Sequence, residues 1–326
     1  MHTRPFFALL SIFFIGCTPA LNNTKPNSSD QSACISSVND HTTSAATDQT
    51  VRGALLGTRF TSLEELKSVI QPEYDSIDTK NQCVRVHHCS NGREVIAVLA
   101  TGTSQGDFVK ARYGGTLWDR VRLLFRCPFA VINRKDLQKI YALSRLRPEW
   151  FGGGDLAFFE IAESMVENIN TPALAFRNTR DSTEKGYLNS FNHITAQAVI
   201  TSCFSEELAD FIADAHERYR HPELITGKFT AAQIADLAEG PVDNYVDLVN
   251  NEWGQELGKQ LRGKYNIDRE TNWTPELLAD YLNDLQGYYS WAFQIGFAPF
   301  RPEDEAVRKF SNKLNIVMKG GLSFNQ

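Results

Sequence analysis

The stretch that begins at Pro241 places an apolar stripe and a polar stripe side by side on one expected helix. Apolar residues recur there at three- and four-residue steps, which is the spacing of a buried helix face: Val242, Val246, Val249, Trp253 and Leu257. The next residue along, turned by about 100°, repeats polar and small types: Asp243, Asp247, Asn250 or Asn251, Gly254 and Gly258. A glycine inside a helix costs about 1 kcal/mol relative to alanine. Two glycines on one stripe therefore predict that another backbone, or a ligand, comes close.

Two other expected helices also carry polar groups beside their buried faces. His216 follows Ile212 by four residues and is joined by Glu217, and Asn189 and His193 lie one turn apart beside an apolar face. Buried polar groups are nearly always paired, so we expect the three helices to meet. The candidate site residues are His193, His216, Glu217, Asp247, Asn250 and Asn251. The alternative is a hydrogen-bonded network that only fixes the register of the helices.

These residue types are sufficient to catalyse hydrolysis, either with a divalent metal or without one. His216 or His193 would activate a water, and Glu217 or Asp247 would orient the imidazole or hold the metal. The zinc-protease pattern His-Glu-x-x-His is not met, because Arg220 stands where its second histidine belongs. Metal ligands would therefore come from different helices, and asparagine ligands would favour a hard cation over zinc.

The chain as a whole is expected to be mainly α, and α+β overall. Residues 51–150 read as a mixed region with a helix opened by Ser62, a hairpin of strands 83–89 and 94–100 around Asn91-Gly92, and a third strand over 107–113. Residues 151–326 read as a helical domain. Helix starts are expected at Asp155, Ser205, Thr230 and Thr274, and Gly240 is expected at the end of the helix that Thr230 opens. We expect Gly287 to follow the end of one helix, and a last helix over about 303–318.

A rival site is the segment Gly102-Thr103-Ser104-Gln105-Gly106, which fits Gly-x-Ser-x-Gly after an apolar strand. That is the context of a nucleophile elbow in an α/β-hydrolase. The parallel strands that such a fold needs are not evident elsewhere in the sequence. A Ser/Gly turn in a β-meander is the favoured interpretation.

The first 17 residues resemble a bacterial lipoprotein signal. Arg4 precedes the apolar run 6–15, which is too short to span a bilayer. Gly16-Cys17 then resembles a lipobox, although Phe14 stands where leucine is usual. The resemblance implies lipidation of Cys17. The alternative is an ordinary signal peptide that is cut near Gly16 and leaves Cys17 free.

Residues 18–50 are polar and cannot bury enough surface to fold, so they are expected to be a disordered tether. Thr18 stands where aspartate would mark inner-membrane retention, which favours an outer-membrane address; secretion is the other possible destination. The net charge is −6 and no basic cluster stands out, which disfavours a nucleic-acid partner. Cys83 and Cys89 would lie too far apart on one strand to share a disulfide.

The three polar segments are together similar to an uncharacterised bacterial domain that occurs in secreted and surface proteins and in some toxin-like C-termini. Its pattern is roughly Asp-Ala-Phe-Arg-His, then His-Glu, then Met-Asp-x-x-Asn-Asn-x-x-Gly. Within about residues 155–292 the matches are His193, residues 213–217, Asp247, Asn250, Asn251, Gly254 and Gly287. Asn189 and Asn192 stand where the family has Asp and Arg, which would weaken this copy if that Asp is a ligand or base. The family has no established activity to transfer.

Together these features predict an exported bacterial lipoprotein of the cell envelope, anchored in a membrane through its lipid. The first hypothesis is a hydrolase, with or without a metal, that uses the His/Glu/Asp/Asn centre on packed helices. The alternative is a non-catalytic envelope or host-interaction lipoprotein whose buried polar network is structural.

Overall fold

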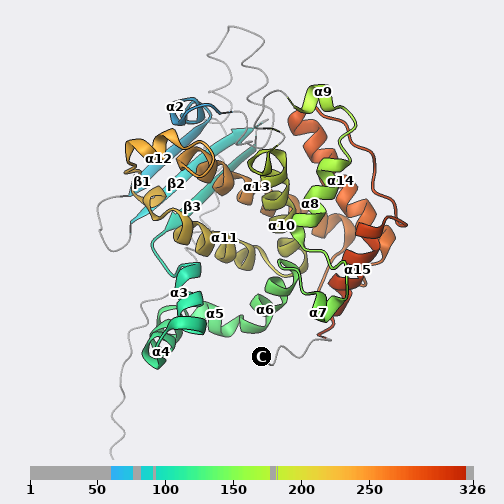
Figure 1. Cartoon of the computed structure of the whole chain (residues 1–326), viewed down its shortest axis with the longest axis horizontal. Coiled ribbons are helices and arrows are strands. Elements are labelled where there is room, and N and C mark those ends of the chain that lie inside the picture. Colours follow the sequence, from blue (N-terminus) through green and yellow to red (C-terminus); the bar gives the residue numbers. More distant parts are fainter. Residues whose placement is uncertain (1–59, 76–81, 91–92, 177–180, 182, 321–326) are drawn as a thin grey trace, which may run out of the picture.

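The computed structural model describes residues 60–75, 82–90, 93–176, 181 and 183–320. Within these ranges helices dominate, and one small antiparallel sheet lies near the N-terminal end of the described chain (Figure 1). The prediction of a mainly α protein with a small β part is confirmed. The expected signal with Cys17, the tether 18–50 and the Asn91-Gly92 turn lie outside the described residues.

The sheet has three strands in the order β1-β2-β3, with bounds Ile70–Asp75, Cys83–Ser90 and Arg93–Ala100. Helix α2, Leu63–Lys67, precedes it and is capped by Ser62, whose hydroxyl accepts a hydrogen bond from the backbone of Glu65. The hairpin of β2 and β3 was predicted, and Val86 pairs with Ala97 at its centre. Cys83 is a free thiol whereas Cys89 is disulfide-bonded, so the two do not pair with each other, as expected.

The prediction of a strand over 107–113 was wrong. That segment forms α3, Gln105–Val109, and the π-helix η2, Lys110–Gly114. Ser104 and Asp107 cap α3 reciprocally: the Ser104 hydroxyl accepts from the Asp107 backbone at 3.3 Å, and the Asp107 carboxylate accepts from the Ser104 backbone at 2.9 Å. This local capping box starts a helix directly after β3, and β1 takes the third place in the sheet.

From α3 onward the described chain is almost entirely helical. The segment before the central helices contains α4 Leu117–Arg126, α5 Pro128–Ile132, α6 Arg134–Leu143, α7 Pro148–Phe151, α8 Phe158–Glu167, α9 Pro172–Ala175 and the π-helix η3 Glu184–Leu188. The remaining elements are α10 Asn189–Cys203, α11 Glu206–Arg220, the 3-10 helix η4 Pro222–Ile225, α12 Ala231–Ala235, α13 Pro241–Tyr265, α14 Pro275–Phe293 and α15 Glu305–Met318.

Most of the predicted helix starts are confirmed. The hydroxyls of Ser205, Thr230 and Thr274 accept hydrogen bonds from the third backbone amide of α11, α12 and α14 respectively. Pro241 occupies the first turn of α13, as predicted. Gly240 does not end the preceding helix, because α12 already ends at Ala235, and it lies instead directly before α13. These caps are local in sequence, which is why the sequence alone could place them.

Two predicted helix boundaries were wrong. Asp155 does not cap α8, which begins at Phe158, where the Glu160 carboxylate accepts a hydrogen bond from the backbone of Ala157 at 2.7 Å. Asp155 instead pairs with Lys313 of α15 at 3.0 Å. Gly287 lies inside α14, which continues to Phe293 and ends where Gln294 adopts a left-handed backbone conformation with φ 55°.

Helices α10 and α13 pack against each other at the centre of the fold. A Cβ atom at Gly254 would lie 2.8 Å from the carbonyl oxygen of Ile194, and one at Gly258 would lie 2.5 Å from that of Ala198. Such distances are too short for any other residue, so both glycines are needed for this approach. The prediction that another backbone comes close to the glycine stripe is therefore confirmed.

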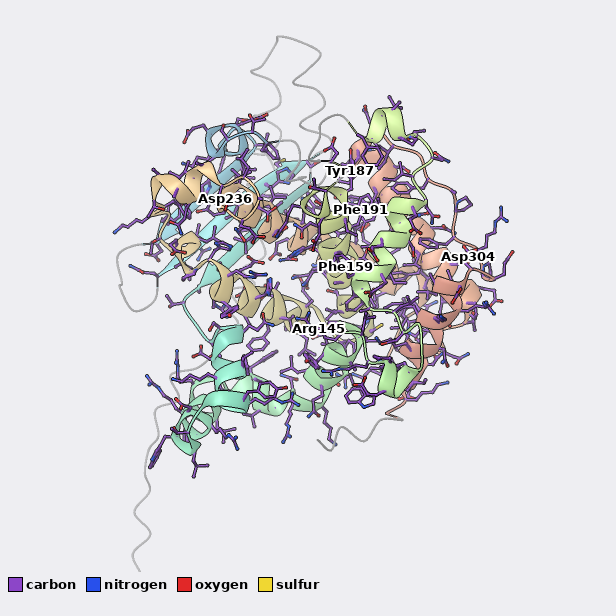
Figure 2. All side chains as sticks on the ribbon, in the orientation of Figure 1. Arg145, Phe159, Tyr187, Phe191, Asp236 and Asp304 are labelled. Atoms are coloured by element: carbon purple, nitrogen blue, oxygen red, sulfur yellow. The ribbon has the colours of Figure 1, made fainter. Side chains whose placement is uncertain are left out.

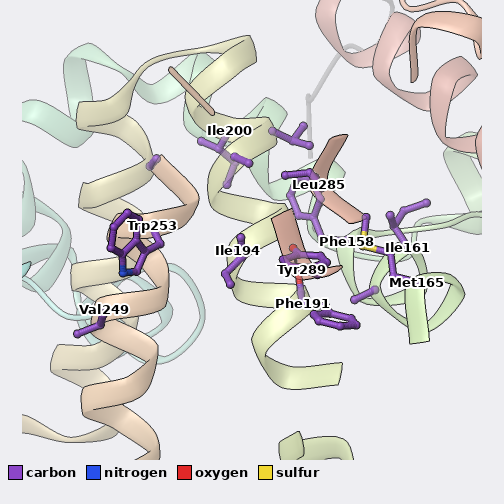
Figure 3. Packing of buried hydrophobic residues seen from close by; sticks show 14 of the residues in the cluster. Phe158, Ile161, Met165, Phe191, Ile194, Ile200, Val249, Trp253, Leu285 and Tyr289 are labelled. Atoms are coloured by element: carbon purple, nitrogen blue, oxygen red, sulfur yellow. Dashed lines mark hydrogen bonds between the residues drawn. The ribbon is translucent and has the colours of Figure 1, made fainter. Parts of the chain in front are cut away.

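The apolar core continues from this helix pair in two directions. Figure 3 shows Ile194 of α10 between Trp253 of α13 and Tyr289 of α14. The Trp253 indole donates a hydrogen bond to His88 Nδ1 of β2 at 2.9 Å, which joins α13 to the sheet. On the other side the rings of Phe191 and Tyr289 stack at 4.3 Å. Figure 2 places Phe191 near the middle of the molecule.

Candidate functional site

The close contact of α10 with α13 brings His193 and Asn251 together. His193 directly precedes Ile194, and Asn251 lies one turn before Gly254, so the glycine contact fixes their separation. His193 Nδ1 lies 3.0 Å from Asn251 Oδ1. An amide oxygen only accepts hydrogen bonds, so Nδ1 carries the proton and donates it. The other ring nitrogen, Nε2, consequently carries a lone pair, which is the form of histidine that binds a metal.

Asp247 and Glu217 complete a three-residue group around this lone pair. Asp247 lies one turn before Asn251 on α13, and its Oδ2 is 3.5 Å from His193 Nε2. Glu217 reaches the same place from α11. Ligand atoms of His193, Glu217 and Asp247 all lie within 4.8 Å of one another. Two ligands of one ion lie at most twice the bond length apart, about 4 to 5 Å for divalent cations, so the spacing suits a single ion.

Glu217 is the least satisfied member of the group. Its side chain is 1 % exposed, and its Oε2 has no hydrogen-bond partner among the described residues. Burial, followed by the charges of Asp247 and Asp243, raises the pKa of Glu217 well above its ordinary value. Burial also lowers the pKa of His193, against the opposing effect of its Asn251 hydrogen bond. A bound cation would offset the cost of burying the Glu217 charge.

Amide side chains orient the ligands. Asn189 Nδ2 of α10 donates a hydrogen bond to Asp247 Oδ1 at 3.1 Å, and Asn251 fixes the tautomer of His193. The expectation that asparagines would act as ligands, and so favour a hard cation, does not fit this geometry. The ligands available are one imidazole nitrogen and carboxylate oxygens from two residues. Such a mixed nitrogen and oxygen ligand set suits Mn²⁺ or Zn²⁺, whereas an all-oxygen ligand set would suit Mg²⁺ or Ca²⁺.

Asn250 is in the core but is not part of the three-residue group. Its side chain is fully buried, and neither its nitrogen nor its oxygen has a hydrogen-bond partner among the described residues. Buried amides without partners are rare in native proteins and often mark an ordered water or ion. After Glu217 of α11, Asn250 is therefore a second buried side chain with unsatisfied polar atoms, and it lies on α13, the helix of Asp247.

His216 does not join the group, although it is adjacent to Glu217 in sequence. Neighbouring residues of a helix point about 100° apart, and His216 Nδ1 lies 3.0 Å from Gln105 Oε1 of α3. Burial, aided by the positive charges around it, lowers the pKa of His216 to about 4, so the imidazole is neutral at pH 7. The structure therefore does not bring His216 and His193 into one site, although the sequence analysis predicted that it would.

Ser104, the candidate nucleophile of the Gly-x-Ser-x-Gly segment, serves as the cap of α3. Its hydroxyl is engaged with Asp107, at 3.1 Å from the carboxylate and 3.3 Å from the backbone nitrogen. Among the described residues Ser104 forms its hydrogen bonds with Asp107, and His216 contacts the next residue, Gln105. The segment is a turn at the end of β3, as the sequence analysis favoured, but it leads into helix α3 and not into a further strand of a β-meander.

Lys185 of η3 is a charged neighbour of the site that the sequence analysis missed. Its Nζ lies 3.5 Å from Asp243 Oδ2 and 3.4 Å from Glu239 Oε1, and its side chain is 29 % exposed. Burial works against its charge, but Asp243 and Asp247 outweigh burial and raise the pKa of Lys185. Lys185 is therefore a stable positive charge at the solvent side of the group. Its contact spans 58 residues of sequence, and no local pattern indicates it.

Segments that lie far apart in the sequence thus meet in one place. His193, Glu217 and Asp247 come from α10, α11 and α13, and Lys185 from the turn that precedes α10. No protein-family model, curated protein or solved structure matches this chain. The chemistry of the site is accordingly inferred from its own side chains.

Proposed function

We propose that this chain is an exported bacterial lipoprotein, acylated at Cys17, that binds a divalent cation through His193, Glu217 and Asp247 and hydrolyses an envelope or host polymer or lipid. The observation that supports the cation is the convergence of three ligand types around a histidine lone pair, together with a buried carboxylate oxygen that lacks a partner. Groups of this kind, with shifted pKa values, concentrate at functional sites.

The chemistry follows from the number of ligands. His193, Glu217 and Asp247 would hold a divalent cation with three protein ligands, and the chemistry that such a cation would supply is the activation of a water for attack on the substrate. Asn251 keeps His193 in the tautomer that presents Nε2. Lys185, charged and partly exposed, lies where it can stabilise negative charge that develops on a substrate oxygen.

Among the described residues, His193 and Lys185 contribute the partly exposed side chains at the group. The side chain of His193 is 17 % exposed and that of Lys185 is 29 % exposed, whereas Glu217 is buried behind them. A substrate would therefore approach over η3 and the start of α10. The group therefore has partly exposed side chains on one side and a buried carboxylate on the other. Such a site is compatible with water as the nucleophile.

Metal content and hydrolysis by the purified full-length chain test the proposal together. We expect about one Mn²⁺ or Zn²⁺ per chain, cation-dependent cleavage of ester, amide or phosphodiester substrates, and loss of both in Asp247→Asn and His193→Ala. Removal of one catalytic metal ligand should lower the rate by at least about a hundredfold. The matched control is Glu256→Gln, a carboxylate on the same helix α13 that pairs with Lys259 at the surface.

Two outcomes would count against this function. Cleavage that persists in Asp247→Asn at the wild-type rate would exclude the group as the catalytic centre. A cation that binds tightly and stabilises the protein, with no cleavage of any substrate class, would favour the alternative of a non-catalytic envelope or host-interaction protein. The burial of Glu217 and Asp247, 1 % and 4 % exposed, is the observation that favours this alternative.

The lipid anchor has its own test. Cells that express the full-length chain should incorporate labelled palmitate into the wild type and not into Cys17→Ser, because only the thiol can form the thioether on which acylation depends. The matched control is Cys203→Ser, a buried free thiol of α10. Palmitate incorporation that survives in Cys17→Ser, or that is absent from the wild type, would leave the ordinary signal peptide as the correct interpretation.

A further inference from the structure

Helix α4 exposes its apolar face to solvent. Its apolar residues fall on one face at positions i, i+1, i+4, i+7 and i+8: Leu117, Trp118, Val121, Leu124 and Phe125. The exposed fractions are 74 % for Leu117, 79 % for Trp118 and 65 % for Phe125. Ordinary surface helices turn such a face inward. This face is therefore unpartnered in the described structure, and α4 lies at the outer edge of the molecule (Figure 1).

The segment is nevertheless fixed to the body of the protein. Cys127 and Ala130 of the α4–α5 region form a small apolar cluster with Phe211 of α11, and Leu123 packs against this cluster. The outward face of α4 therefore belongs to a helix that is packed against the rest of the protein. Tyr113, just before α4, and Ile132, at the end of α5, are also exposed, at 70 % and 81 %.

The same segment concentrates positive charge in an otherwise acidic chain. Residues 109–135 contain seven Lys and Arg and one acidic residue, Asp119, which gives +6, whereas the whole chain carries −6. On α4, Arg120 and Arg122 are exposed and flank the apolar face, whereas the exposed Arg126 lies 3.9 Å from Asp107. Asp119 is occupied in a capping box with Thr116. The sequence analysis missed this concentration because it weighed charge over the whole chain.

We propose that α4 and its flanking turns bind the surface of a membrane that contains anionic lipids, with Trp118 and Phe125 in the headgroup region. An exposed Trp/Leu/Phe face bordered by arginines is the pattern of helices that lie in the plane of the interface. No described helix is long and apolar enough to cross a membrane. A nucleic acid would use the arginines alone and would leave the aliphatic face in water, so the lipid surface accounts for more of the observations.

This surface is independent of the cation centre and does not require acylation of Cys17. Where an acyl chain is present, the two contacts reinforce each other, since a single acyl chain gives only marginal, reversible binding and a second signal makes anchoring stable. The pairing would also hold the folded part in one orientation against the membrane.

Vesicle binding of the full-length chain tests the proposal, with Cys17→Ser in every sample so that no acyl chain contributes. Co-sedimentation is measured with phosphatidylcholine vesicles with and without phosphatidylglycerol. We expect binding that needs the anionic lipid and weakens with salt, and that falls about tenfold or more in Trp118→Ser/Phe125→Ser. Arg120→Gln/Arg122→Gln should bind more weakly as well. The control is Trp291→Ser, an aromatic residue of α14 that is 42 % exposed.

Hydrogen exchange on the same samples makes the result specific to this segment. Amides of residues 109–132 should become protected when vesicles are added to the Cys17→Ser protein and should stay unprotected when Trp118→Ser/Phe125→Ser is also present. Equal sedimentation of the Cys17→Ser protein with and without Trp118→Ser/Phe125→Ser, or vesicle binding without protection of this segment, would overturn the proposal. So would a concentration-dependent dimer that the double variant abolishes without vesicles, or tight nucleic-acid binding in place of vesicle binding.

Discussion

Replacing Glu217 with glutamine is expected to stabilise the protein in the presence of a chelator and to abolish the stabilisation that a divalent cation gives the wild type. Without a cation, the buried Glu217 carboxylate faces Asp247 and Asp243, and its Oε2 has no partner among the described residues. An uncompensated buried charge costs about 3 kcal/mol or more. Glutamine keeps the shape, carries no charge and can donate to the neighbouring carboxylates. With a cation bound, the negative charge of Glu217 stabilises the folded protein, and the neutral glutamine cannot provide this stabilisation.

The pH dependence of stability should change in a defined direction. The pKa of Glu217 is raised in the folded protein, by burial first and then by Asp247, Asp243 and Asp214, with Lys185 opposing. The folded state therefore holds the proton at pH values where the unfolded state has lost it. Stability then falls as pH rises from the ordinary carboxyl range, about 4.3, through the raised folded value. In chelator this loss should be smaller in Glu217→Gln than in the wild type.

Urea unfolding at pH 5 and pH 8, with chelator and with Mn²⁺ or Zn²⁺, measures both effects. Other partly buried carboxyls on α11 and α13, Asp210, Asp214 and Glu252, also have raised pKa values, so only the difference between variant and wild type reports on Glu217. Glu207→Gln, at the exposed start of α11, is the matched control. An identical pH slope and an identical cation effect in Glu217→Gln would show that Glu217 neither bears a buried charge nor binds the ion.

The parts of the fold that the sequence could predict are those encoded locally. The capping hydroxyls of Ser205, Thr230 and Thr274 lie within three residues of the amides they bind, so the starts of α11, α12 and α14 follow from short patterns. The glycines of α13 also act through a local property, the lack of a side chain, and the close helix contact was predicted from them. The strand expected at 107–113 failed because the Ser104–Asp107 cap was not recognised.

The composition of the site depended on contacts that no local pattern records. His193 and His216 both border apolar helix faces in the sequence, and nothing there distinguishes them. Their tertiary partners do: His193 faces α13 across the glycine contact, and His216 faces Gln105 of α3. The sequence could therefore name six candidates, of which the structure brings His193, Glu217 and Asp247 together and uses Asn251 to orient one of them.

Lys313→Met is expected to destabilise the protein by about 3 to 5 kcal/mol, because it leaves a buried carboxylate without its counter-charge. The side chains of Lys313 and Asp155 are 1 % and 2 % exposed, and the ammonium lies 3.0 Å from the carboxylate. The ammonium also donates to the carbonyl oxygens of Arg145, at 2.9 Å, and Leu156, at 2.7 Å. Burial lowers the pKa of Lys313 while Asp155 opposes that effect, so the pair depends on these hydrogen bonds to offset its desolvation.

This pair ties α15 to the segment between α6 and α8, 158 residues away in sequence. Urea unfolding of Lys313→Met, Asp155→Leu and the double variant forms a cycle that isolates the coupling between the two side chains. We expect the double variant to be more stable than Lys313→Met, because it no longer buries an unpaired charge. Lys309→Met, in a half-exposed pair with Glu305 on the same helix, should change stability by no more than about 0.5 kcal/mol. Equal effects of Lys313→Met and Lys309→Met would mean that the buried pair contributes nothing beyond an ordinary surface ion pair.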